Sequence, residues 1–139
     1  MTPERLADLH ALSFETPRPW SAEEFRGLLD DDSVFLCEHA SGFALGRVAA
    51  GEAELLTLAV DPDRQRQGIG AELLDALEQS AAKKMADKMF LEVSADNRAA
   101  LALYVSAGYA ESGRRPNYYR SPDGHRIEAV VMAKALTTT

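Results

Sequence analysis

The chain has 139 residues, of which 46% are hydrophobic, with a formal net charge of -7 and an isoelectric point near 4.9. This length fits a single domain, residues 1–139, with one continuous core. The excess of carboxylates disfavours direct nucleic-acid binding, which requires clustered Lys and Arg. It suits an ordinary solvated surface or a cationic partner.

Several other site classes are also excluded. Cys37 is the sole cysteine, and its apolar setting predicts a buried strand thiol rather than a nucleophile. The histidines at 10, 39 and 125 are far apart, so we expect no metal site. The N-terminus lacks the pattern of a leader, and no apolar run approaches the roughly 20 residues of a membrane span. We therefore expect a cytoplasmic protein without membrane contact.

Two short helices are predicted first. Apolar residues from 3 to about 12 have helical spacing. Ser21 and Glu24 then form a capping-box pattern that begins a second helix, and Trp20 can pair with Phe25 as a hydrophobic staple.

Three strand candidates follow: Ser33 to His39, Phe43 to Ala50 and Glu52 to Val60. The short gaps between them predict an antiparallel meander. A helix with a clear amphipathic period then runs from about Gly68 to Lys84. Its apolar face comprises Ile69, Leu73, Leu74, Leu77 and Ala81.

The C-terminal part has the same mixed character. Lys88 to Ser94 is predicted as a buried strand, and Asn97 caps a helix that runs to about Ala107. Gly108 ends this helix as a left-handed residue. The last two strands are Tyr109 to Tyr118 and Arg126 to Lys134, joined by a turn.

The most informative segment is Gln65-Arg66-Gln67-Gly68-Ile69-Gly70, between an apolar strand and the long helix. Glycines let the backbone approach a phosphate, and the positive end of the helix dipole attracts its charge. A Walker pattern is excluded by the glycine spacing and the missing Lys-Ser/Thr pair. A dinucleotide fingerprint is excluded because the third glycine is missing. The segment predicts a site for another phosphorylated cofactor.

The pattern Q-x-x-G-x-G resembles the coenzyme A pyrophosphate loop of the GNAT acyltransferases. The resemblance spans roughly Leu9 to Met132. Its further blocks are Leu58-Ala59-Val60-Asp61-Pro62, Phe90-Leu91-Glu92-Val93, Asn97 to Tyr104, and Ala107-Gly108-Tyr109. Within the superfamily the chain is most similar to the RimI type, the ribosomal-protein-alanine N-acetyltransferases, through Pro19-Trp20-Ser21 and the segment from Arg114 to Tyr119.

The resemblance implies an α/β (α+β) GNAT fold with a mixed, mostly antiparallel central sheet, a splayed central strand pair and flanking helices. Relatives carry a strand before the first helix, and we expect it to be absent because only two residues precede the helix signal. The turn after the long helix lacks the glycine that relatives often carry, which leaves its geometry open.

The resemblance also implies acetyl-CoA as cosubstrate, without a metal. The strand from 52 to 60 is expected to bulge and to part from the strand 88–94, leaving a slot for the pantetheine arm. Amides of Leu58 and Val60 would bond the arm and the thioester oxygen. Arg64 and Arg66 either add charge to the phosphate site or belong to a solvated loop. The expected cofactor residues are Leu58, Ala59, Val60, Arg66, Gln67, Gly68, Ile69, Gly70, Ala71, Asn97 and Tyr104.

Two residues are candidates for proton transfer. Glu92 interrupts an apolar strand beside the expected slot and is the candidate general base; the alternative is a strand carboxylate that faces solvent. Tyr104 lies two helical turns after Asn97, and the resemblance implies that its hydroxyl protonates the leaving thiolate. The alternative is an aromatic that packs between helix and sheet.

The acceptor groove is expected to be lined by Trp20, Glu92, Tyr118 and Tyr119, with core packing as the rival role for the aromatic residues. Strand alternation sends Tyr118 and Tyr119 to opposite faces, which favours Tyr119 for the groove.

The favoured function is acetyl transfer to a protein N-terminal α-amine, by direct attack in a ternary complex, with a small-subunit ribosomal protein as the candidate acceptor. The alternatives are an acetyltransferase for lysine side chains or small amines, a noncatalytic coenzyme A binding subunit, and an interaction domain without cofactor. We expect a monomer or a weak homodimer.

Overall fold

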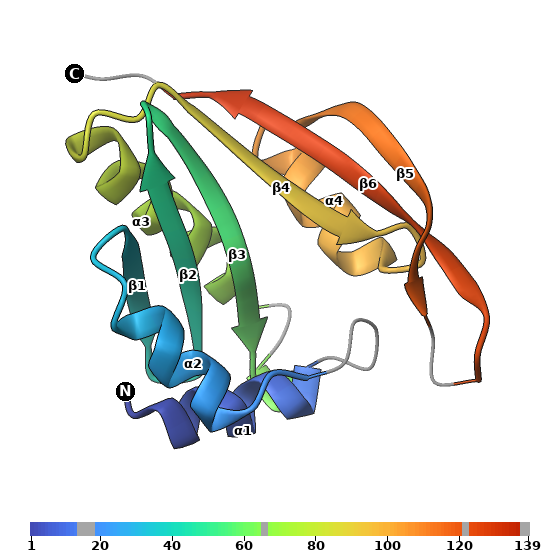
Figure 1. Cartoon of the computed structure of the whole chain (residues 1–139), viewed down its shortest axis with the longest axis horizontal. Coiled ribbons are helices and arrows are strands. Elements are labelled where there is room, and N and C mark those ends of the chain that lie inside the picture. Colours follow the sequence, from blue (N-terminus) through green and yellow to red (C-terminus); the bar gives the residue numbers. More distant parts are fainter. Residues whose placement is uncertain (14–18, 65–66, 121–122, 137–139) are drawn as a thin grey trace.

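One mixed sheet of six strands lies between two layers of helices (Figure 1). The computed structural model describes residues 1–13, 19–64, 67–120 and 123–136. The strands, in the spatial order β1-β2-β3-β4-β6-β5, are Val34–His39 (β1), Gly42–Ala49 (β2), Glu52–Val60 (β3), Lys88–Ser94 (β4), Ala110–Arg120 (β5) and Arg126–Ala135 (β6). The described helices are Pro3–Ser13 (α1), Ala22–Leu29 (α2), Ile69–Lys83 (α3), Arg98–Ser106 (α4) and the 3-10 turn Pro62–Arg64 (η1). The predicted mostly antiparallel α/β fold is confirmed.

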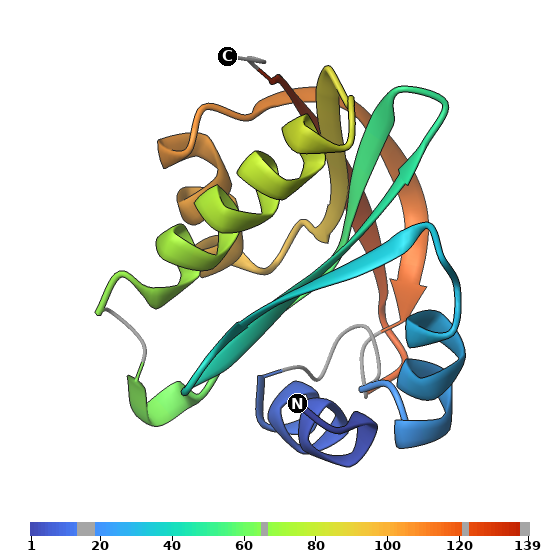
Figure 2. The same cartoon turned by 90° about the vertical axis from the view of Figure 1, so that its left-hand side faces the viewer.

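The helices divide between the two faces of the sheet (Figure 2). α3 and α4 cover one face, and α1 and α2 cover the other near β1 to β3, so the buried side chains form two core clusters. All five residues predicted for the apolar face of α3 are buried there. Among the described residues no strand precedes α1, as predicted, and β1 is therefore an edge strand.

The predicted capping box at the start of α2 is confirmed. Ser21 Oγ accepts a hydrogen bond from the Glu24 N–H at 3.2 Å, and the Ser21 N–H donates to Glu24 Oε1 at 3.1 Å. The rings of Trp20 and Phe25 lie 5.6 Å apart, which is the expected hydrophobic staple. These contacts fix the point at which the chain enters α2.

A bulge in β3 reverses the faces that its side chains occupy. The register with β2 passes from Thr57 to Leu55 between adjacent β2 residues, so Leu56 is the additional residue. Leu55 packs in the core beneath α3, whereas Thr57 and Ala59 face α1 and α2. The expected bulge is confirmed.

The expected splayed pair of strands is also confirmed. Four residue pairs join β3 to β4 in parallel, from Glu52 with Lys88 to Leu55 with Leu91. Beyond them β3 remains paired with β2, and β4 remains paired with β6 through Ser94. The two strands therefore diverge while each keeps its other neighbour (Figure 1).

The turn after α3 is closed by a methionine where a glycine is usual. Met85 takes a left-handed conformation with φ of 70°. Its N–H donates to the Ala82 carbonyl, and the Ala86 N–H donates to the Ala81 carbonyl, both at 3.0 Å. This is a Schellman motif, and the buried Ala86 supplies its apolar contact.

We expect Met85→Gly to raise the free energy of unfolding by about 0.5–1 kcal/mol, because the left-handed strain exceeds the entropy cost of glycine. The side chain is 79% exposed, so little packing is lost. Urea denaturation provides the measurement. Met85→Ala is the matched control, which keeps the strain and should change stability much less.

Candidate functional site

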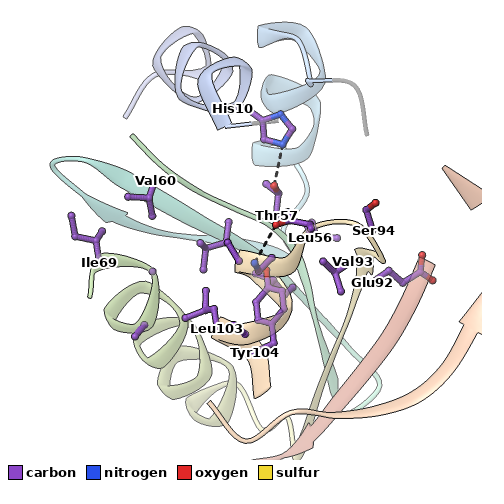
Figure 3. A pocket seen from close by; sticks show the side chains of 18 of the residues that line it. His10, Leu56, Thr57, Val60, Ile69, Glu92, Val93, Ser94, Leu103 and Tyr104 are labelled. Carbon is purple, nitrogen blue, oxygen red and sulfur yellow. Dashed lines mark hydrogen bonds between the residues drawn. The ribbon is translucent and has the colours of Figure 1, made fainter. Parts of the chain in front are cut away.

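A cavity of about 830 Å³ opens where β3 and β4 part. Figure 3 shows Val60 and Ile69 on one side, Glu92 on the other, and Tyr104 between them below Thr57. Nearly all of the described residues predicted for the site line this cavity. They are Trp20, Leu58, Val60, Gly68, Ile69, Gly70, Ala71, Glu92, Asn97, Tyr104, Tyr118 and Tyr119.

The first turn of α3, residues 68–71, lines one end of the cavity. Gly68 is left-handed, with φ of 79°, and its carbonyl accepts the first helical bond, from the Glu72 N–H at 3.0 Å. The amides before Glu72 therefore have no acceptor within the helix. A Cβ on Gly70 would lie 3.3 Å from Leu103 of α4, so glycine allows the two helices to approach. The amides and the helix dipole suit an anion.

Four neighbouring predictions have different outcomes. Arg66 lies outside the described residues. Gln67 is exposed and does not line the cavity, whereas Arg64, in η1, does. Ala59 is buried on the opposite side of β3, in the core beneath α1 and α2.

The backbone of β3 directs the amide of Leu58 into the gap. The Asp61 N–H donates to the Ser41 carbonyl at 2.7 Å, on the β2 side. Because adjacent residues of a strand direct their N–H groups to opposite sides, Ala59 shares the direction of Asp61, and Leu58 and Val60 have the other. β4 does not pair with β3 at this level. The Leu58 N–H therefore points into the cavity.

Glu92 projects from β4 into the cavity rather than into open solvent. Its side chain is 20% exposed, and Oε1 lies 3.2 Å from Arg115 Nη2 of β5. Its neighbours Leu91 and Val93 are buried beneath the helices of the other face. The carboxylate is thus partly desolvated, with its charge paired, and a proton acceptor is available in the wall of the cavity.

A second carboxylate, Glu54 on β3, also lines the cavity and was missed in the sequence. Glu54 pairs with Phe90, two residues before Glu92, so the two carboxylates share one face of the sheet. Burial raises the pKa of Glu54, and the charge of Glu92 adds to this, against the guanidinium groups of Arg47 and Arg115. The available signal was the place of Glu54 on the strand predicted to border the slot.

Tyr104 projects from α4 and is 7% exposed. Its ring packs edge-on against Tyr109, with 6.0 Å between centroids. Burial raises the pKa of the Tyr104 hydroxyl above its usual range, and the nearby Tyr119 adds to the effect. The hydroxyl is therefore protonated at neutral pH and can act as a donor inside the cavity.

Asn97 lies at the start of α4, and its Oδ1 accepts a hydrogen bond from the Ala100 N–H at 3.1 Å. The predicted cap is confirmed. Gly108, with φ of 99°, follows the end of this helix as predicted. A cofactor contact of Asn97 remains a prediction.

The expectation that Tyr118 and Tyr119 occupy opposite faces is wrong. Both line the cavity, and their ring centroids lie 5.1 Å apart. Asn117 has a positive φ of 55°, and the register of β5 with β6 shifts between Arg115 and Tyr119. This irregularity interrupts the alternation on which the expectation depended. Burial, followed by the charge of Glu92, raises the pKa of Tyr119 to about 12.

His10, which the sequence did not single out for the site, lies in α1 at the edge of the cavity (Figure 3). Nε2 is 3.0 Å from Thr57 Oγ1, and Nδ1 accepts a hydrogen bond from the Trp20 N–H at 3.0 Å. Burial lowers the pKa of His10 from 6.5 to about 4, although the charge of Glu24 opposes this. The ring is neutral at pH 7.

This shift predicts a loss of stability in acid. Between pH 6.5 and 4 the unfolded chain binds a proton at His10 that the folded chain excludes, so unfolding becomes easier as the pH falls. The contribution reaches about 2 kcal/mol by pH 5. In His10→Asn the fall in unfolding free energy from pH 7 to pH 5 should be smaller by that amount. Parallel pH dependence in the two proteins, measured by urea denaturation, would contradict the assignment.

In the part of the chain that the structure describes, no helix has both the length and the apolar character to cross a bilayer. Nor does any group of His, Cys, Asp and Glu side chains among those residues form a candidate metal site.

The strand gap, the glycine-bearing helix start and the cavity between them define an acyltransferase-type site. Residues 4–109 match the model of the acetyltransferase (GNAT) family, and the chain belongs to this family. It is 46% identical over 93 residues to a ribosomal protein bS18-alanine N-acetyltransferase from Escherichia coli, an alignment that covers 67% of this chain and 62% of that protein. The corresponding protein of Salmonella typhimurium is 39% identical over 119 residues, an alignment that covers 83% of this chain and 80% of that protein.

A solved structure agrees with these relatives. The crystal structure of the ribosomal-protein-S18-alanine N-acetyltransferase from Escherichia coli matches with a TM-score of 0.83 and 34% identity. The match covers 96% of this chain and 86% of that one.

Proposed function

We propose that this chain is a single-domain, acetyl-CoA-dependent N-acetyltransferase that acts on a protein N-terminal α-amine. The observation that carries the proposal is the gap between β3 and β4. It brings the Leu58 amide, Glu92, Tyr104 and the start of α3 to one cavity. Similarity to the bS18-alanine N-acetyltransferases supports the same reaction class.

The described residues fit an elongated, anionic carrier molecule. The amides of the first turn of α3 suit its pyrophosphate, with Arg64 nearby in the cavity wall. The unpaired stretch of β3 suits the amides of a pantetheine arm, which can bond to the Leu58 backbone as a strand would. Arg66 and Val60 are further proposed contacts.

We propose direct attack of the amine on the thioester. Its nitrogen forms a bond to the acetyl carbon, and its surplus proton passes to Glu92 directly or through water. The oxygen of the tetrahedral intermediate accepts a hydrogen bond from Leu58 N–H. As the carbon–sulfur bond breaks, Tyr104 gives its proton to the thiolate. Proton exchange with solvent then restores both residues.

An α-amine is the acceptor that this site suits best. Its ordinary pKa is about 8, against about 10.4 for a lysine, so a carboxylate base has less work to do. Trp20, Tyr118 and Tyr119 line the same cavity as Glu92 and offer aromatic surfaces for the acceptor peptide. We propose a small-subunit ribosomal protein as the substrate and the cytoplasm as the place of reaction.

Thiol release on three acceptors tests the proposal: a peptide with free N-terminal alanine, the same peptide N-blocked with an internal lysine, and a small primary amine. We expect release with the first only, and mass spectrometry should locate the acetyl group on the α-amine. Release with either of the others alone would assign a different acceptor. A rise in melting temperature with acetyl-CoA, but no release with any acceptor, would indicate a noncatalytic binding protein.

A further inference from the structure

His10 joins two walls of the cavity, and none of the proposed catalytic steps uses it. The ring is 1% exposed. Because Nδ1 accepts the Trp20 N–H, the neutral ring carries its proton on Nε2 and donates it to Thr57 Oγ1. The two hydrogen bonds thus fix one tautomer and one ring orientation.

Aromatic packing holds Trp20 in the same place. The His10 ring stacks on the Trp20 ring, with 5.0 Å between centroids and 21° between planes. Phe25 meets the His10 ring edge-on at 5.5 Å, and it meets Phe43 of β2 at 5.6 Å. Trp20 is therefore connected through His10 to the sheet.

The other end of this connection is the bulge of β3. Thr57 is the first residue after the additional Leu56, and it precedes Leu58, whose amide points into the gap. His10 consequently joins Trp20 to the part of β3 that faces the proposed thioester, through its two hydrogen bonds. The start of α3, where the phosphates are proposed to bind, is at another part of the cavity (Figure 3).

We infer that His10 is a positioning residue that sets the affinity for the acceptor peptide. It does so by holding Trp20 at the cavity wall, in a fixed position relative to the β3 bulge. This inference rests on the proposed function, which places Trp20 beside the acceptor. His10 acts through Trp20 and touches no reacting atom. The KM for the peptide should therefore depend on His10, whereas kcat and the KM for acetyl-CoA should not.

Two substitutions separate the two hydrogen bonds. In His10→Asn the amide oxygen can replace Nδ1 and keep the bond from Trp20. In His10→Gln the amide nitrogen can replace Nε2 and keep only the bond to Thr57. Both lose the ring, so their difference reports the bond to Trp20. We expect a peptide KM about three- to tenfold higher in His10→Gln than in His10→Asn, the range for one lost hydrogen bond.

In the same assays the two variants should have kcat values within about twofold of one another. Their KM values for acetyl-CoA should agree equally well. Equal peptide KM values, with only a lower melting temperature or a smaller active fraction, would overturn the inference and leave His10 as a core residue. If the unaltered enzyme acetylates no peptide N-terminus, the proposed function itself fails, and the kinetic comparison fails with it.

A readout independent of activity is available, because Trp20 is the sole tryptophan of the chain. Acrylamide should quench its fluorescence more strongly in His10→Gln than in His10→Asn, and the unaltered protein should be quenched least. Identical quenching in all three proteins would overturn the positioning role whatever the activity assays show.

Discussion

Tyr104→Phe should lower kcat by about 10²- to 10⁴-fold at saturating acetyl-CoA and peptide, the usual contribution of a positioned general acid. The ring fills the same space, so both KM values should stay within about threefold, because only the transition state loses a contact. Steady-state thiol release gives both parameters. Burial raises the pKa of Tyr104 beyond the ordinary range, so its ionisation should not produce an alkaline limb near pH 9.

Tyr109→Phe is the matched control. Tyr109 packs against Tyr104, but its hydroxyl donates to Glu78 at 3.0 Å, and the residue does not line the cavity. We expect kcat within about twofold, together with a stability cost of about 1 kcal/mol for the lost hydrogen bond. Comparable kcat losses in both variants would mean that the hydroxyl of Tyr104 has no special part in the reaction.

Glu92→Gln should also lower kcat by about 10²- to 10⁴-fold near neutral pH, because the amide cannot accept the proton of the amine. The loss should diminish as the pH rises and the free amine becomes abundant. Glu54→Gln is the informative comparison, since both carboxylates occupy one face of the sheet beside the cavity. We expect that variant to retain kcat within about tenfold.

The reverse order, with the larger loss in Glu54→Gln, would transfer the role of base to β3. The reason to favour Glu92 is its place in the cavity wall with Arg115 as charge partner. The reason to test Glu54 is its raised pKa, which burial causes and the neighbouring charge of Glu92 increases.

The local signals in the sequence predicted most of the framework. The capping box at Ser21, the apolar face of α3 and the cap at Asn97 depend on neighbours within a few residues, and all were found as predicted. The glycine-bearing turn predicted the proposed phosphate end of the cavity for the same reason, since a strand, a turn and a helix start are contiguous in the chain.

The rest depended on register between distant segments. Glu54 joins Glu92 only because β3 and β4 pair in parallel at that level, and Tyr118 joins Tyr119 only because β5 departs from regular pairing. His10 meets Thr57 across 47 residues, and the bulge at Leu56 turns that threonine toward α1. Periodicity along one segment contains no information about such pairings.

The short pairing of β3 with β4, which has only four residue pairs, affects the local stability of the sheet. Since the ladders of β3 with β2 and of β4 with β6 are longer, the β3–β4 pairing should open before either half unfolds. The Leu58 amide hydrogen, which points into the gap, should exchange early with deuterium. A pantetheine arm bound along the unpaired stretch of β3 would take the place of a neighbouring strand. A bound carrier should therefore slow the exchange of amide hydrogens on both sides of the gap at once.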